Sequence, residues 1–149
     1  MPSKSDWVQT NDVPQLLAEE GVPVVRSQNA RMVAEFRRAF DLPMRAFPAP
    51  LDADLDLHAR LIAEETSEFL VAVREKNPVE ILDALADLMY VIYGAALDCG
   101  FDIDAAFSEV HRSNMSKLGA DGRPILNEVG KVQKGPNYSP PDLRGLAGQ

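Results

Sequence analysis

Residues 80–90 of the chain read Glu-Ile-Leu-Asp-Ala-Leu-Ala-Asp-Leu-Met-Tyr, a run in which acidic residues interrupt an otherwise apolar sequence. The wider segment 78–99 carries apolar residues in nearly every direction around a helical axis, which predicts a central helix that packs against several partners. An ionised carboxylate is costly to bury unless it is paired, hydrated or bound to a metal. Asp83 and Asp87 have no evident packing purpose in this helix, so they indicate a functional site.

A second acidic helix is predicted immediately before it, from Asp52 or Asp54 to Lys76, because Asn77-Pro78 supplies a stop. The connection is short, so the two helices should pack antiparallel with their acids facing one another. Residues three or four apart share a helix face. Three groups on the two helices can therefore converge: Glu65 or Glu64 with Glu68, Asp83 with Asp87, and Tyr90, which follows three residues after Asp87.

Such a group of oxygen ligands without histidine favours magnesium or manganese over zinc. The alternative for the three glutamates alone is an ordinary solvated helix face. Asp83 and Asp87 favour the metal site, since aspartate is a mediocre helix former.

The rest of the chain predicts two further helices. One begins after Ser27 as its N-cap and runs to about Phe40. Its charged residues are expected to face solvent, namely Arg31, Glu35, Arg37 and Arg38. The other begins at Asp102 or Asp104 and carries His111, Asn114 and Lys117 near its far end.

Irregular structure is expected between and around these helices. Residues 1–26 form a lead-in, residues 41–51 a proline-containing loop, and the Gly, Pro and Asn residues after 119 an arm with short strands at 124–126 and 129–133. The predicted fold is all-α, with four main helices in a bundle completed by dimerisation and an irregular C-terminal arm. Its domain spans 27–145, and 146–149 form a tail.

Composition narrows the function classes. The 149 residues have the length of one domain, and a net charge of −8 disfavours a nucleic-acid polymer as partner. With one cysteine, Cys99, and two histidines, His58 and His111, there is no zinc framework. No apolar run is long enough for a membrane span and no signal-peptide pattern is present, so a cytoplasmic protein is expected.

Several motifs in a fixed order extend over about residues 27–145 and resemble the all-α nucleoside triphosphate pyrophosphohydrolases. This MazG-like superfamily includes the dimeric dUTPases and phosphoribosyl-ATP pyrophosphohydrolase. The motifs are Glu64-Glu65-x-x-Glu68, Asp87-Leu88-Met89-Tyr90-Val91, Tyr93-Gly94, the segment 111–117 and the arm from Gly130-Lys131 to Asp142. One position departs from the family pattern, which often has Glu-x-x-Asp, because Ala84 stands three residues before Asp87. Asp83 or Glu80 would then replace the missing acid, and Asp83 is preferred.

The resemblance implies hydrolysis of a (deoxy)nucleoside triphosphate to the monophosphate and pyrophosphate with Mg²⁺, or Mn²⁺ in its place. It implies that Glu64 and Glu65 are catalytic and that the metal ligands are Glu65, Glu68, Asp83 and Asp87. The implied substrate-binding residues are Asn29, Tyr90, Asn114, Lys117, Lys131 and Lys134. A homodimer, or a tetramer of two dimers, is the implied assembly.

Ordinary structural roles stay open for several of these residues. Each lysine can be a solvent-exposed residue, and Tyr90 can be a core residue with a satisfied hydroxyl group. Phe36 and Phe40 can stack on a base, although phenylalanines at helical spacing are more often core residues. Two other functions also stay open: hydrolysis of another diphosphate-containing metabolite, and a non-catalytic helical dimer that binds nucleotide or protein.

Overall fold

A computed structural model describes residues 25–46 and 51–149. This part of the chain contains four α-helices and no β-strand, so the predicted all-α class is confirmed. The helices are α2 (Gln28–Ala39), α3 (Leu55–Glu75), α4 (Pro78–Cys99) and α5 (Ile103–Met115), and a short 3₁₀ turn, η2, spans Gly145–Ala147. The predicted lead-in falls almost wholly outside the described residues, as does part of the proline-containing loop.

Local sequence signals set the helix boundaries. The Ser27 side chain accepts a hydrogen bond from the backbone N–H of Ala30 at the start of α2, and Asp54 does the same for Leu57 at the start of α3. Asn77 caps α4, and Gly100 ends it with a φ of 73°, a left-handed conformation that glycine adopts without strain. The predicted limits of these three helices are therefore confirmed to within one or two residues.

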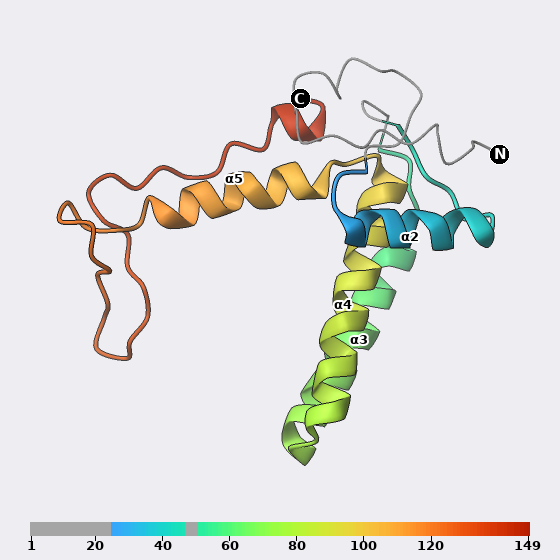
Figure 1. Cartoon of the computed structure of the whole chain (residues 1–149), viewed down its shortest axis with the longest axis horizontal. Coiled ribbons are helices and arrows are strands. Elements are labelled where there is room, and N and C mark those ends of the chain that lie inside the picture. The colour runs from blue at the N-terminus through green and yellow to red at the C-terminus, as the bar shows by residue number, and fades with distance from the viewer. Residues whose placement is uncertain (1–24, 47–50) are drawn as a thin grey trace. The chain divides into compact units, whose positions relative to one another are not determined.

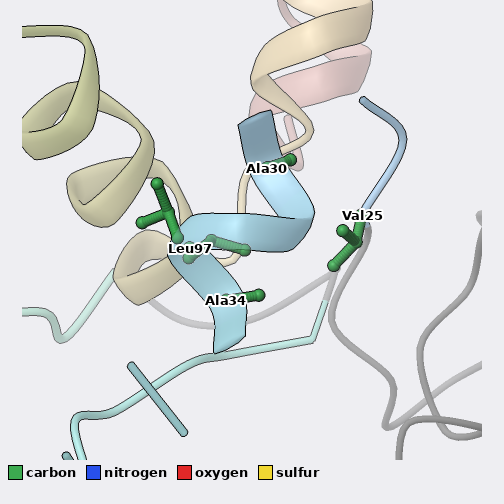
Figure 2. Packing of buried hydrophobic residues seen from close by; sticks show 5 residues of the cluster. Val25, Ala30, Ala34 and Leu97 are labelled. Atoms are coloured by element: carbon green, nitrogen blue, oxygen red, sulfur yellow. The ribbon is translucent and has the colours of Figure 1, made fainter. Parts of the chain in front are cut away.

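The helices α3 and α4 pack side by side as an antiparallel hairpin, and α2 packs against α4 (Figure 1). The buried apolar cluster lies where α2 meets the C-terminal half of α4. It contains Leu97 of α4 together with Val25, Ala30, Val33 and Ala34 (Figure 2). Small alanine side chains on α2 let the two helices approach closely at this crossing.

Most large apolar side chains of the hairpin stay exposed in the single chain. Val79 is 71% exposed and Leu82 is 69% exposed, although both belong to the most apolar helix. As predicted for a central helix, α4 contacts more than one partner, α3 and α2, but one copy of the described chain leaves part of its apolar surface uncovered.

Two sequence-based expectations were wrong. Arg37 was expected to face solvent, but it is buried, and its guanidinium donates two hydrogen bonds to the carbonyl oxygen of Pro43. The short strands expected at 124–126 and 129–133 are reduced to one isolated antiparallel bridge between Leu126 and Val132. A single bridge forms there because the segment is almost entirely exposed, so its apolar side chains have little to pack against in the described chain.

A buried polar cluster joins elements that are distant in the sequence. Asp98, near the end of α4, forms an ion pair with Arg45. Its carboxylate also lies 2.7 Å from His58 Nε2 of α3 and 3.9 Å from Arg37 Nη2 of α2. Arg45 also pairs with Asp52 at 2.6 Å. We call this set the Asp98 cluster; it ties the end of the hairpin to α2 and to the loop after it.

The chain divides into two compact units, residues 1–102 and 103–149. In the second unit, the segment after α5 turns back along that helix. Arg112 pairs with Glu109 and donates to the carbonyl oxygen of Pro140, and the backbone N–H of Asp142 donates to Glu109. Among the described residues, no helix has both the length and the apolar character that crossing a membrane requires.

Candidate functional site

The acidic residues of α3 and α4 come together around Glu65. Its side chain is partly buried, and the pKa of its carboxyl group is raised first by loss of hydration and then by nearby acids. In order of effect these are Asp87, Glu68, Glu64 and Asp83. The structure thus brings five predicted site residues from two helices into one electrostatic neighbourhood, and Glu80 is not among the groups that raise this pKa.

Glu65 also holds an unsatisfied polar atom. Its Oε2 is buried and has no hydrogen-bond partner in the described part of the chain. Buried carboxylate oxygens are normally paired, so an oxygen without a partner among other acids leaves one position for a cation or a proton. The chemistry of this donor set fits a hard divalent cation.

The acids do not form a finished ligand cage. Within the described residues, no group of three or more His, Cys, Asp or Glu side chains is arranged so that it could hold a metal ion as it stands. Glu64, Glu68 and Asp83 are exposed, so their side chains are free to rotate about the partly buried Glu65 and Asp87. A cation would therefore have to gather ligands that are neighbours but do not yet converge.

Asn29 and Tyr90 line one pocket of about 230 Å³ between α2 and α4. The other lining residues are apolar or aromatic, namely Met32, Val33, Ala86, Met89 and Tyr93. Residues 86, 89, 90 and 93 follow the helical spacing that places them on one face of α4. Spacing of this kind could have indicated Met89 and Tyr93 as pocket residues; both belong to the quoted family motifs but were given no binding role.

Two phenylalanines near this pocket, Phe36 and Phe40, are exposed to solvent. Phe36 lies edge-on to Tyr90, with ring centroids 5.5 Å apart, and also contacts Phe40. Both phenylalanines are exposed in the described chain, so neither is a core residue within a single copy. Burial raises the pKa of the Tyr90 phenol, with a further contribution from Glu35, so the phenol stays protonated and can donate a hydrogen bond.

The predicted basic residues gather in the second unit. Lys117, Lys131 and Lys134 line one pocket of about 430 Å³, together with Val132 and Gln133. Asn114 belongs to the same group, because its Oδ1 accepts a hydrogen bond of 2.8 Å from Lys117 Nζ. We call these three lysines the lysine pocket; all of its residues belong to the unit of residues 103–149.

The Asp98 cluster is the main polar feature that the sequence analysis missed. The one available signal was Asp98 itself, an acid in the last turn of α4, where the helix dipole disfavours negative charge. A carboxylate at such a position needs compensating cations, and Arg37, Arg45 and His58 supply polar partners.

Comparison with known proteins places residues 33–114 within the family described as phosphoribosyl-ATP pyrophosphohydrolase. A curated relative, an uncharacterised protein of Acanthamoeba polyphaga mimivirus, is 30% identical over 118 residues. That alignment covers 73% of this chain but 43% of the viral protein, so the chain spans less than half the length of this relative.

A solved structure from Exiguobacterium sp. 255-15, of a protein to which NTP pyrophosphohydrolase activity is attributed, is 26% identical. The match covers 77% of this chain and 89% of the other, with a TM-score of 0.38. This score is too low to compare the two arrangements of helices in space.

Proposed function

Because the chain belongs to the phosphoribosyl-ATP pyrophosphohydrolase family, we propose that it hydrolyses a nucleoside or deoxynucleoside triphosphate between the α and β phosphates, giving the monophosphate and pyrophosphate. The observation that supports this most is the gathering of acids from α3 and α4 around the unsatisfied Glu65. Four or five like charges in one place destabilise each other unless a cation or protons offset them.

The proposed metal ligands are Glu65, Glu68, Asp83 and Asp87. Where the sequence departs from the family pattern, at Ala84, Asp83 is preferred over Glu80 as the replacement ligand, since Asp83 is among the acids that raise the pKa of Glu65. Magnesium, with manganese as substitute, would supply neutralisation of phosphate charge when bound. The two carboxylates proposed to act on the attacking water are Glu64 and Glu65.

Glu65 lies at the centre of the acid group and is the carboxylate proposed to take a proton from the attacking water. Burial and neighbouring acids raise its pKa in the metal-free chain, and a bound cation would lower it. Glu64 is exposed and lies one residue away, so it can accept a hydrogen bond from a water that Glu65 deprotonates. The proton leaves the water oxygen for the carboxylate as that oxygen attacks the phosphorus, and pyrophosphate leaves.

The pocket between α2 and α4 is proposed to bind the nucleoside. Its apolar and aromatic lining suits the faces of a base, and Asn29 can both donate and accept hydrogen bonds at a base edge. Tyr90 is proposed to donate a hydrogen bond to the substrate from the same pocket. The lysine pocket, with Asn114, is proposed to bind phosphate oxygens.

A homodimer is the proposed assembly, or a tetramer of two such dimers. Exposed apolar residues follow α4 from Val79 and Leu82 to Met89 and Ile92, and α3 adds Leu70 and Val73. A second copy with the same surface would remove these side chains from water, which is the main driving force for permanent association. The proposed location is the cytoplasm, where nucleoside triphosphates are available.

Product analysis tests the proposed reaction. The chain is incubated with a panel of ribo- and deoxyribonucleoside triphosphates and with phosphoribosyl-ATP, each with Mg²⁺, with Mn²⁺ and with a chelator. We expect pyrophosphate and a monophosphate in equal amounts, and none with the chelator. Release of orthophosphate in place of pyrophosphate, or no release from any substrate, would show that the proposal is wrong.

A further inference from the structure

The lysine pocket brings together residues that are far apart in the sequence. Lys117 follows α5, whereas Lys131 and Lys134 lie beyond the turn at residues 119–130. The three lysines line one pocket although their positive charges disfavour close approach, so the backbone must hold the two segments together. In the described part of the chain none of the three takes part in an ion pair, since Lys117 Nζ contacts the neutral Asn114 and Lys134 Nζ lies 4.6 Å from the centre of the Tyr138 ring.

The backbone contact that joins the two segments is made by Gly135. Its N–H donates a hydrogen bond of 2.9 Å to the carbonyl oxygen of Lys117. A Cβ atom on residue 135 would lie 2.3 Å from the carbonyl oxygen of Leu118 and 2.8 Å from that of Lys117. These distances are far below any van der Waals contact, and because both neighbours are backbone atoms, no side-chain rotation can relieve them.

Gly135 differs in this respect from other glycines of the same unit. A Cβ atom on Gly145 would meet nothing within 4 Å, and its φ is not positive. The φ of Gly135 is not positive either. Glycine is therefore required at this position for close approach and not for an unusual backbone conformation. An alanine at 135 would push the backbone of Lys134 away from that of Lys117.

We propose that Gly135 is a positioning residue that builds the lysine pocket into a single binding site for a polyphosphate anion. Its contact with Lys117 and Leu118 holds Lys134 beside Lys117, so that two ammonium groups from distant segments bind one ligand. The identity of the ligand as a triphosphate or pyrophosphate rests on the proposed function. The pairing of the two segments by Gly135 rests on geometry alone.

The test measures binding of inorganic pyrophosphate to the full chain by calorimetry at fixed ionic strength, without substrate turnover. We expect Gly135→Ala to weaken binding roughly tenfold, whereas Gly145→Ala, the matched control, leaves it unchanged. Lys134→Met should weaken binding in the original chain but have little further effect in the Gly135→Ala chain. Unchanged affinity in folded Gly135→Ala would show that the glycine is merely structural and would overturn the proposal.

A second cycle covers the case in which Gly135→Ala does not fold. Lys117→Met and Lys134→Met are then combined in the otherwise unchanged chain. Weaker pyrophosphate binding in each single variant and still weaker binding in the double variant support one shared site; unchanged affinity in either single variant overturns it.

Steady-state kinetics separate this inference from the proposed function. Gly135→Ala should raise KM with kcat retained, because uniform binding is lost. A chain that binds pyrophosphate through these lysines but hydrolyses no triphosphate would remove the proposed function and keep the inference. If the original chain hydrolyses triphosphates and folded Gly135→Ala does so with the same KM and kcat, the proposed function stands and the inference about Gly135 is wrong.

Discussion

His58 Nε2 lies 2.7 Å from Asp98 Oδ2, although the two residues are 40 positions apart in the sequence. The contact joins the first turn of α3 to the last turn of α4 and is buried, with Arg37 and Arg45 beside it. The open end of the hairpin is therefore fixed by polar interactions in addition to the apolar cluster around Leu97. Such a cluster is satisfied only when all of its members are in place.

Loss of the Asp98 carboxylate should destabilise the folded chain. Asp98→Ala removes the carboxylate that pairs with Arg45 and His58 and lies 3.9 Å from the buried Arg37, and breaking a buried ion pair from one side costs about 3 kcal/mol or more. We expect a decrease of this size in the free energy of unfolding, measured by urea denaturation. Glu75→Gln, at the exposed end of α3, is the control and should change it by less than about 0.5 kcal/mol.

Stability should fall in mild acid because of His58. Burial lowers the pKa of His58 below its usual 6.5, and the nearby Arg37 lowers it further. Below about pH 6.5 the unfolded chain therefore binds a proton that the folded chain does not bind until a lower pH, so the folded state loses stability as pH falls through this window. Urea midpoints measured between pH 5 and 8 should show this slope, His58→Gln should reduce it, and exposed His111→Gln should leave it unchanged. An identical slope in His58→Gln would contradict the assignment.

Glu65 should have the opposite effect on the metal-free protein. Its raised pKa means that the charged form is disfavoured in the folded state, so the stability linked to its proton is present at low pH and lost as pH rises. Glu65→Gln should therefore raise Tm near neutral pH without metal and abolish any rise in Tm on adding Mg²⁺. Thermal unfolding with and without Mg²⁺ measures both effects, and Glu75→Gln should retain the Mg²⁺ response of the original chain. A full Mg²⁺ response in Glu65→Gln would remove Glu65 from the proposed ligands.

Asp87→Asn should abolish turnover while the fold stays intact. The change keeps the shape of the side chain but removes one negative charge from the acid group around Glu65. We expect kcat/KM to fall by roughly 100-fold or more, with unchanged circular dichroism. Asp56→Asn, in the first turn of the same hairpin, is a charge-matched control. Full activity of Asp87→Asn would exclude this residue from the metal site.

Self-association should depend on the apolar surface of α4. Leu82 is 69% exposed in the single chain, so Leu82→Glu places a charge on the proposed dimer surface. We expect light scattering to show a shift from dimer towards monomer. Val129→Glu, at a residue of the second unit that is 85% exposed, should keep the dimer. Equal masses for the original chain and Leu82→Glu would argue against this surface.

Helix limits were accessible from the sequence because their causes are local. Ser27, Asp54 and Asn77 cap helices within three residues, and Gly100 ends one through its own backbone conformation. The acids of α3 and α4 were accessible for a related reason, since a short connection between two helices fixes their antiparallel pairing. Roles for individual acids stay predictions, because a metal ligand set depends on side-chain rotation as well as helix position.

The sequence by itself determined four helices, the limits of α2, α3 and α4 and the two acidic faces, because spacing, capping and the Asn77-Pro78 stop act over a few residues. Only the tertiary structure decided that Arg37 is buried, that His58 meets Asp98, and that Gly135 approaches Lys117 too closely for any side chain. These contacts join segments separated by long stretches of chain. Their partners are selected by packing and burial in three dimensions, which no local pattern encodes.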